Sequence, residues 1–289
     1  MTRVAPIWGI LGGPYVDLSE ALDLSPLEVI DAEVSRGLAQ VETAYTGGTL
    51  KWMGVVAPWA RNDRYLDAMQ VLESLPDEEL AVFLSLSDDT RELSVADRAG
   101  LHFGDETDYP FSREQERWLS FRHGVYFPWK VCYHLLENDR WEDKHSGAGK
   151  GFSDEAREVF PETVRYLEAL PFEEIGRAVI FGLQPNDHAP LHRDSEPGAS
   201  LAIAQSISLC PRGDKRFFLQ NSEGDEPLVI DARAYWFNDM DYHGVLSDPW
   251  FRYSVRVDGV FASGFVESLR TRTGTETARS SVAPAWRRR

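Results

Sequence analysis

The second half of the chain is a series of short strand-like runs, and this pattern constrains the fold more than any other feature. From residue 175 onward, β-branched and aromatic runs alternate with clusters of Pro, Gly, Asn and Asp, at the spacing typical of an antiparallel sandwich or barrel. The runs are RAVIFGLQP, SLAIAQSISLCP, RFFLQNS, EPLVIDARAYWFND and FRYSVRVDGVFASG. We therefore expect antiparallel β-structure here.

The first half mixes helical and extended signals. Apolar residues at helical spacing predict one helix over residues 26–41, capped by Ser25, and another over residues 62–75. β-Branched and aromatic content favours strands over residues 49–59 and 80–88. A further short helix is expected to begin at Pro161, since proline is well suited to the first helical position.

Polar segments separate these elements. Residues 104–118 and 139–153 contain glycine and few apolar groups, and both are interpreted as connections that form lids or are disordered. The end of the chain lacks periodicity and is rich in Thr, Ser and Arg. We therefore divide the chain into an N-terminal helix and strand region (1–157), a β-rich catalytic core (158–267) and a flexible tail (268–289).

Composition excludes several classes of protein. The formal net charge of −17 opposes binding to phosphate backbones, so no nucleic-acid partner is expected. No apolar run is long enough to span a bilayer, and the start of the chain lacks a convincing signal peptide, which predicts a cytoplasmic protein without a membrane partner. Cys132 and Cys210 form neither a CxxC pair nor a disulfide framework, so buried free thiols are expected.

The stretch NDHAPLHRDSEPG, residues 186–198, carries the main chemical signal. In extended chain, His192 and Asp194 point to the same face because they are two residues apart. A third ligand, His243, lies at the end of another predicted strand. Two imidazoles and one carboxylate with open positions suit non-haem Fe(II). The spacing thus predicts an iron site of His192, Asp194 and His243.

The strand after His243 adds a candidate anion site. Arg252, Ser254 and Arg256 lie on one face of an otherwise apolar run. An arginine inside a barrel is costly unless an anion pairs with it, and its fork suits a carboxylate. We expect Arg252 to bind a carboxylate with Ser254 as a second donor, and Arg256 to form a surface or inter-strand pair.

Together these motifs resemble the Fe(II)/2-oxoglutarate-dependent oxygenases, in particular their aspartyl/asparaginyl β-hydroxylase-like branch, which includes bacterial proline hydroxylases. The resemblance covers residues 158–265, through FPETVRYLEALPF, PNDHAPLH, FNDMDYHGV and RYSVRVDGVF. It implies an α+β protein with a double-stranded β-helix core of jelly-roll or cupin-like form, preceded by N-terminal helical and strand elements. The resemblance does not extend to the first 150 residues.

The resemblance also implies roles for individual residues. His192, Asp194 and His243 would ligate iron, Arg252 would bind the distal carboxylate of 2-oxoglutarate, and Gln205 would be a further cosubstrate contact. One departure is that the aspartyl hydroxylases have glycine where this chain has Asp194. A complete triad is more like that of the proline-type members, and it argues against halogenation.

The implied activity is hydroxylation of an unactivated C–H bond by O2, coupled to decarboxylation of 2-oxoglutarate to succinate and CO2. The substrate would be an amino acid or a residue of a peptide, in bacterial specialised metabolism. Substrate choice would lie in residues 1–157 and the polar connections.

Other interpretations stay open. Glu196 is an alternative carboxylate ligand, as in cupin-like sites. A cupin-like isomerase or cosubstrate-independent dioxygenase would use the same ligands without needing Arg252. A non-catalytic barrel that binds a small acid is a third class. Trp129, Lys130 and His134 are candidate substrate contacts, although core packing is the favoured interpretation, and His188 is expected to hydrogen-bond at the rim.

Overall fold

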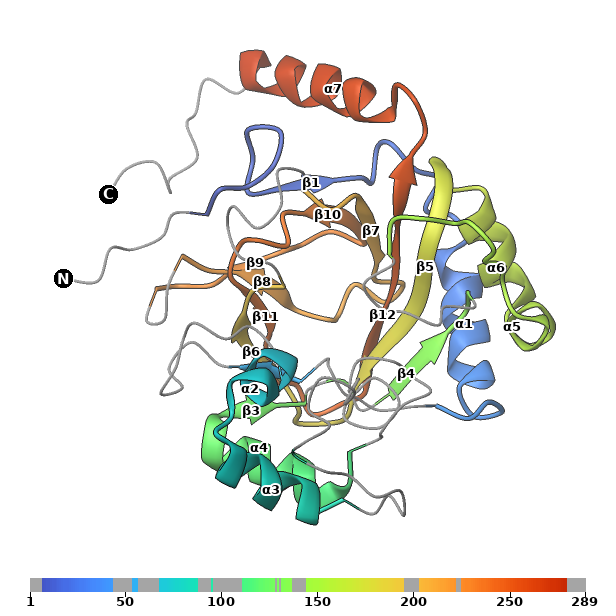
Figure 1. Ribbon diagram of the computed structural model, residues 1–289. Helices are drawn as coiled ribbons and strands as arrows, with labels where there is room; N and C mark the ends of the chain where they lie inside the picture. The colour runs from blue at the N-terminus through green and yellow to red at the C-terminus, as the bar shows by residue number, and fades with distance from the viewer. Residues whose placement is uncertain are drawn as a thin grey trace.

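The computed structural model describes residues 7–43, 54–56, 68–87, 95, 111–127, 129, 131–136, 144–194, 203–221 and 225–279. These residues form mixed helix and sheet, and the larger sheets are antiparallel, as the strand-like runs predicted. Figure 1 shows the sheets at the centre, with helices beside, below and above them.

The larger sheet has the strand order β1-β10-β7-β12-β5-β4. Its longest strands, β5 and β12, pair from Phe172↔Phe261 to Leu183↔Arg252, and this ladder forms its centre. The strands are β1 (Tyr15–Asp17), β4 (Val131–His134), β5 (Phe172–Leu183), β7 (Ser206–Leu209), β10 (Ala234–Phe237) and β12 (Arg252–Phe261). Since β1 and β4 come from the first half of the chain, the N-terminal region is part of this sheet.

The smaller sheet has the order β6-β11-β8-β9, and it packs against the larger one. Its strands are β6 (Ala189–His192), β8 (Phe217–Leu219), β9 (Leu228–Val229) and β11 (His243–Val245). Between the sheets, Phe217 of β8 contacts Tyr235 and Phe237 of β10, at ring-centroid distances of 5.4 and 4.7 Å. An apolar layer therefore joins the two sheets.

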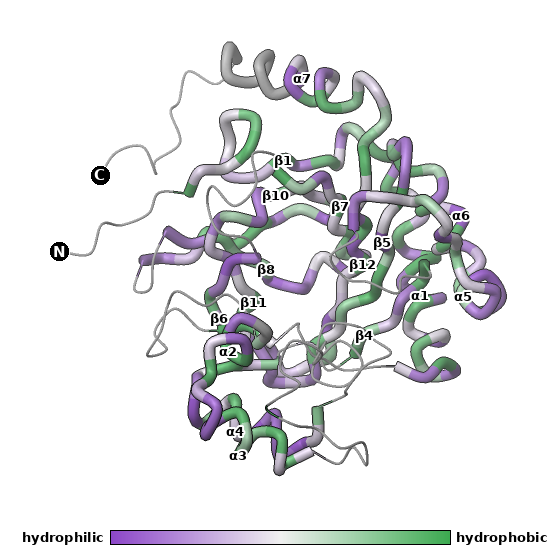
Figure 2. The backbone as a smooth tube through the Cα atoms, viewed as in Figure 1, coloured by the Kyte–Doolittle hydropathy of each residue, from purple (hydrophilic) through white to green (hydrophobic). Residues whose placement is uncertain are grey.

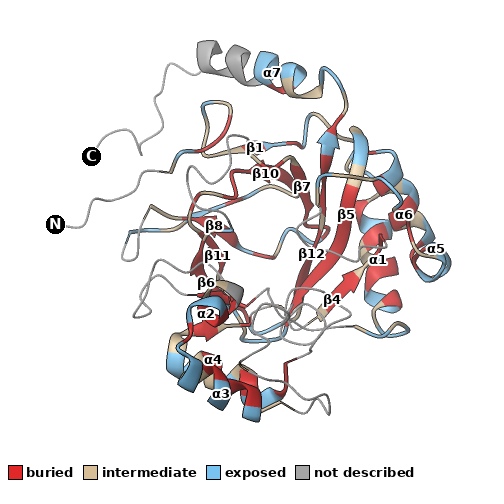
Figure 3. Cartoon of the chain, viewed as in Figure 1, coloured by how far each residue is buried: buried red, intermediate tan, exposed pale blue. Residues whose placement is uncertain are grey.

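The outer face of the larger sheet is covered by helices. Helices α1 (Leu27–Gly37), α5 (Asp154–Val159) and α6 (Pro161–Glu168) lie beside β5 and β4, and their inner residues share one buried cluster with the sheet. Figure 2 shows apolar residues along β5 and α1, whereas the outside of α5 is hydrophilic. Burial follows the same pattern, with β5, β7, β10 and β12 largely buried (Figure 3).

Strand β12 therefore separates two environments. Tyr253, Val255 and Val257 face the helices and join their apolar cluster. By the two-residue period of a strand, Arg252, Ser254, Arg256 and Asp258 face the smaller sheet instead. The predicted arginine face thus points into the space between the sheets.

The described residues between positions 54 and 127 form a separate satellite with its own apolar core (Figure 1, lower part). It comprises the ladder of β2 (Val55–Val56) and β3 (Val125–Tyr126) and helices α2 (Ala68–Ser74), α3 (Asp77–Ser85) and α4 (Arg113–His123). The strand expected at 80–88 is wrong, because most of it lies in α3. An apolar run of this length does not distinguish a buried strand from a buried helix.

The connection expected at 104–118 is also partly wrong. Its last residues begin α4, where the Ser112 hydroxyl accepts a hydrogen bond from the Gln115 backbone N–H and the Ser112 backbone N–H donates to Oε1 of Gln115. This reciprocal capping starts the helix within a polar segment. Residues 104–110 lie outside the described residues.

Two more differences concern helix ends. Pro26 rather than Ser25 caps α1, without a side-chain hydrogen bond. The predicted flexible tail is wrong for residues 268–279, because they belong to α7 (Phe265–Arg279). Leu269 is buried in the main core, which anchors a helix that its Thr-rich sequence does not favour. Among the described residues, the search for a helix long and apolar enough to cross a membrane found none.

Candidate metal centre

The two sheet strands β6 and β11 bring the predicted histidines together. His192 is the last residue of β6, His243 is the first of β11, and the two are register partners. Asp194 follows β6 by two residues, and its backbone N–H donates to the Asp239 carbonyl at 3.0 Å. His243 is 49 residues from Asp194 in the sequence, and the fold brings it to His192 and Asp194 at the end of β6.

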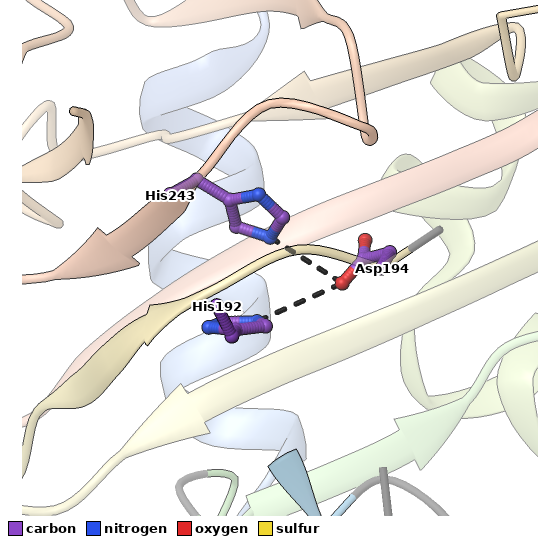
Figure 4. Close-up of side chains that lie close together, drawn as sticks. All are labelled: His192, Asp194 and His243. Carbon is purple, nitrogen blue, oxygen red and sulfur yellow. Dashed lines mark ion pairs between the residues drawn. The ribbon is translucent and has the colours of Figure 1, made fainter. Parts of the chain in front are cut away.

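The three side chains converge on one point. The Nε2 atoms of His192 and His243 lie 3.6 and 3.3 Å from the same oxygen, Oδ1 of Asp194. Figure 4 shows both rings directed at this carboxylate. One ligand atom from each residue lies within 4.8 Å of the others. This spacing is compatible with three ligands to a single ion.

Backbone carbonyls hold the two rings in the orientation that a metal requires. Nδ1 of His192 lies 2.7 Å from the Pro190 carbonyl, and Nδ1 of His243 lies 2.8 Å from the Asp241 carbonyl. A carbonyl only accepts, so each neutral ring carries its proton on Nδ1 and leaves a lone pair on Nε2. Three lone-pair donors therefore face one another, which is favourable when a cation lies between them.

The electrostatics of the site favour the metal-binding forms of two ligands. Burial, together with the neighbouring His243, lowers the pKa of His192 to about 4, so its imidazole is neutral near pH 7. Burial acts to raise the pKa of the Asp194 carboxyl, but the two imidazoles and Arg256 hold it well below its usual range. Asp194 is therefore ionised. Its side chain is 32% exposed, whereas both histidines are buried.

The predicted carboxylate partner, Arg252, is already engaged by the protein. Its guanidinium donates from Nη1 to the Leu246 carbonyl and from Nη2 to the Asp187 carbonyl at 2.7 Å. Nη1 also lies 3.4 Å from Oδ2 of Asp248. The side chain is fully buried. These contacts tie two loops, the one between β5 and β6 and the one between β11 and β12, to the start of β12.

Lys215 is a buried cation that the sequence analysis missed. Its Nζ donates to the Ser254 hydroxyl on the inner face of β12, and it lies 4.7 Å from the centre of the Trp129 ring. No carboxylate pairs with this ammonium among the described residues. Burial, together with the nearby Arg256 and Arg252, lowers the pKa of Lys215 to about 8. A buried cation whose partners are a hydroxyl and a ring face is suited to an anionic ligand.

The remaining predicted residues have clear positions. Gln205 contacts the far end of β12, where its Oε1 accepts from the Phe261 N–H. His188 stacks on Tyr126 of the satellite, with ring centroids 4.9 Å apart. Lys130 and Glu196 lie outside the described residues. Both cysteines are buried free thiols, as expected.

The donor set fits Fe(II). Two imidazoles and one carboxylate form the facial arrangement that leaves three positions open for exogenous ligands. The carbonyl partners of both imidazoles supply the outer contacts that fix ligand orientation in such sites.

Comparison with solved structures finds partial similarity to oxygenases. An oxidoreductase of the 2OG-Fe(II) oxygenase family from Burkholderia pseudomallei is 13% identical, with a TM-score of 0.28, over 44% of this chain and 66% of that one. A Pseudomonas putida prolyl-4-hydroxylase is 13% identical, with a TM-score of 0.23, over 35% and 58%. A viral collagen prolyl hydroxylase from Paramecium bursaria Chlorella virus-1 is 6% identical, with a TM-score of 0.25, over 44% and 76%.

No family model and no curated protein matches the sequence. The first of these structures is described as a 2OG-Fe(II) oxygenase, and the other two are described as prolyl hydroxylases. The aligned part spans less than two thirds of the first two structures. We therefore infer the activity of this chain from its own side chains.

Proposed function

We propose that this protein is an Fe(II)- and 2-oxoglutarate-dependent oxygenase that hydroxylates an unactivated C–H bond. One observation carries the proposal. The Nε2 atoms of His192 and His243 face the same Asp194 oxygen at 3.6 and 3.3 Å, with both Nδ1 atoms held by carbonyls. This is the arrangement of a two-histidine, one-carboxylate iron site.

The proposed fold is a double-stranded β-helix. Supporting it, β5, β7, β10 and β12 lie in the larger sheet, whereas β6, β8, β9 and β11 lie in the smaller one. From β5 to β8 the chain therefore alternates between two facing sheets. The metal ligands lie where β6 and β11 pair, against the inner face of the larger sheet.

His192, Asp194 and His243 would hold Fe(II) in this proposal. With 2-oxoglutarate and O2, the ion would supply the oxidising power for hydroxylation, coupled to release of succinate and CO2. The protein's own residues bind and orient the reactants. Phe217 and Phe237 contact the His243 ring at 5.4 and 4.9 Å, so they shield one side of the site from water.

We further propose that Lys215 and Ser254 bind the distal carboxylate of 2-oxoglutarate, in place of Arg252. Nη1 and Nη2 of Arg252 donate to carbonyls and Nη1 also lies near Asp248, which leaves only its buried Nε without an acceptor among the described residues, whereas the Lys215 ammonium has a hydroxyl as its hydrogen-bond partner. Ser254 lies two residues, about 7 Å along β12, from Arg256, and both side chains face the smaller sheet. Because Arg256 contacts Asp194, the proposed anchor lies on the same inner face of β12 as the residue that reaches the ligand cluster.

The proposed substrate is an amino acid or an amino-acid residue of a peptide, acted on in the cytoplasm and in bacterial specialised metabolism. The sequence resemblance supports this class. The packing of Tyr126 on His188 brings the satellite to the rim next to β6, where it would contribute to substrate choice.

The test is anaerobic addition of Fe(II) and then 2-oxoglutarate. We expect tight metal binding, a visible charge-transfer band when the 2-oxo acid chelates the ion, and succinate formation when air is admitted. His192→Ala and His243→Ala should each abolish all three signals.

The matched control is His188→Ala, because this histidine stacks at the rim and does not face Asp194. It should keep metal binding. A protein that binds Fe(II) through both histidines but neither binds nor consumes 2-oxoglutarate would instead be the cosubstrate-independent enzyme. If neither His192→Ala nor His243→Ala lost metal binding, the proposed iron site would be wrong. A barrel that binds a small acid would then be the remaining interpretation.

A further inference from the structure

A continuous series of buried charges runs from β5 across β12 to the metal ligand Asp194. Arg177 donates from Nε and Nη2 to Oδ2 of Asp258, at 2.9 and 2.7 Å. The other oxygen of Asp258, Oδ1, accepts from Nε of Arg256 at 3.1 Å. Nη1 of Arg256 then lies 3.4 Å from Oδ2 of Asp194. The two oxygens of Asp258 thus bind different guanidinium groups, and Arg256 is shared between Asp258 and Asp194.

The far end of this series is rigid. Arg177 and Asp258 are register partners on the long β5–β12 ladder, and their side chains are 2% and 0% exposed. Because Asp258 is bound by two guanidinium groups, it fixes the Nε side of Arg256. Arg256 also lies over the Phe237 ring, 5.3 Å from its centre. The guanidinium therefore reaches Asp194 from a fixed direction.

Asp194 needs such a partner more than the two histidines do. It lies beyond the end of β6, and its side chain is 32% exposed. The histidine rings are fixed by carbonyls, whereas rotation about the Asp194 side-chain bonds would exchange its two oxygens. Arg256 removes this freedom because it engages Oδ2 while Oδ1 faces both histidines.

We propose that Arg256 is a positioning residue that holds Asp194 as a ligand through one oxygen, with Asp258 and Arg177 as its support. This inference rests on the proposed iron site. A carboxylate that bound through both oxygens would use a coordination position that must stay open for exogenous ligands. Arg256 would therefore keep that coordination position open for the proposed chemistry, in addition to strengthening metal binding.

The expectation from sequence for Arg256 was a surface or inter-strand pair. Its side chain is in fact 11% exposed and faces the smaller sheet. The same alternation that predicts Arg252 inside also places Arg256 inside. Sequence alone did not indicate which of the two would lie next to the iron ligands.

The experiment compares Mn(II) binding by wild type, Arg256→Gln and Arg256→Lys without 2-oxoglutarate, by calorimetry. We expect Arg256→Gln to weaken Mn(II) binding by roughly 10- to 100-fold, since loss of an outer-shell partner has effects of this size. Arg256→Lys keeps the buried charge but lacks the planar fork, so its loss should be smaller. Arg212→Gln is the matched control, because Arg212 pairs with Asp31 on α1 and not with a ligand.

A second readout reports ligand geometry directly. Infrared spectra of Mn(II)-loaded protein with isotope-labelled aspartate distinguish a carboxylate bound through one oxygen from one bound through two. We expect the one-oxygen signature in wild type and in Arg212→Gln, and a two-oxygen signature in Arg256→Gln. Thermal melting without metal checks that each variant is folded. If Arg256→Gln is not folded, Arg256→Lys is compared with wild type instead.

The outcomes separate this inference from the proposed function. If wild type binds no Mn(II), the iron site itself is wrong. If wild type binds Mn(II) through His192 and His243 but both Arg256 variants match it in affinity and infrared signature, only the positioning role is overturned.

Discussion

Two buried cations next to the inner face of β12 have opposite surroundings. Arg252 donates to the carbonyls of Leu246 and Asp187 and lies beside Asp248, so its charge is compensated within the protein. Lys215 has the Ser254 hydroxyl and the Trp129 ring as partners. Both cations are desolvated, but among the described residues only Arg252 has backbone carbonyls and a carboxylate as partners.

On this difference we base the proposal that Arg252 is a structural cation and Lys215 a ligand-binding one. Removing a compensated buried cation leaves its acceptors unpaired and destabilises the fold. Removing an uncompensated buried cation removes the desolvation penalty of its charge. Only the affinity for the ligand that it would bind is then lost. The sequence alone predicted the opposite assignment, since Arg252 matched the expected carboxylate partner.

The largest expected effect is the loss of stability when Arg252 is removed. Arg252→Ala should lower the free energy of unfolding by roughly 3 kcal/mol, because it strands two buried carbonyls and Asp248. Denaturant unfolding measures this. Arg216→Ala is the control, since its half-exposed guanidinium contacts the same Asp248 carboxylate at 2.9 Å and should contribute at most about 1 kcal/mol.

The next largest effect is the loss of 2-oxoglutarate affinity when Lys215 is removed. Lys215→Met should weaken 2-oxoglutarate binding to the metal-loaded protein by about 100-fold, the value of one charge-assisted contact. Stability without ligand should stay equal or rise. Lys150→Met, which removes an ammonium bonded to the Gly176 carbonyl, should leave affinity unchanged. Loss of affinity in a folded Arg252 variant, with normal affinity in Lys215→Met, would reverse the comparison.

A smaller effect is a pH dependence of stability that originates at Lys215. Burial lowers its folded-state pKa from 10.5 to about 8, so the unfolded chain binds more protons between these pH values. Wild-type stability should therefore rise with pH in this window, relative to Lys215→Met, by up to about 1 kcal/mol per pH unit. Below pH 8 the difference should be constant. Chemical denaturation of both proteins across the window measures it, and parallel curves would contradict the prediction.

The smallest expected effect is the loss of 2-oxoglutarate affinity when the Ser254 hydroxyl is removed. Ser254→Ala should weaken 2-oxoglutarate binding about fivefold, corresponding to one neutral hydrogen bond of about 1 kcal/mol. Ser254→Thr keeps the hydroxyl and should retain most of the affinity. Calorimetric titration with Mn(II) present measures both. An unchanged Ser254→Ala affinity would place the carboxylate elsewhere.

Much of the site geometry followed from the sequence because its causes are local. The two-residue spacing of His192 and Asp194 acts over one short segment, and β-branched runs predicted most strands of the second half. The helix beginning at Pro161 is confirmed as α6. These features depend on neighbouring residues and the period of one element.

Features that depend on partners distant in sequence were missed. The run over residues 80–88 is apolar enough for either a strand or a helix, and packing on the satellite core selects the helix. Lys215 lies in the polar turn CPRGDKR, which gives no sign of burial. Its burial arises because folding brings it against Ser254 and Trp129, 39 and 86 residues away along the chain.

The sequence by itself determined which residue types could ligate iron and on which face of β12 the basic residues would lie, because side-chain alternation is a local property of extended chain. Only the tertiary structure decided that Arg252 would be compensated, that Lys215 would not be, and that Arg256 would engage Asp194. Compensation of a buried charge depends on which acceptors the fold delivers to it, and those acceptors come from other strands and loops.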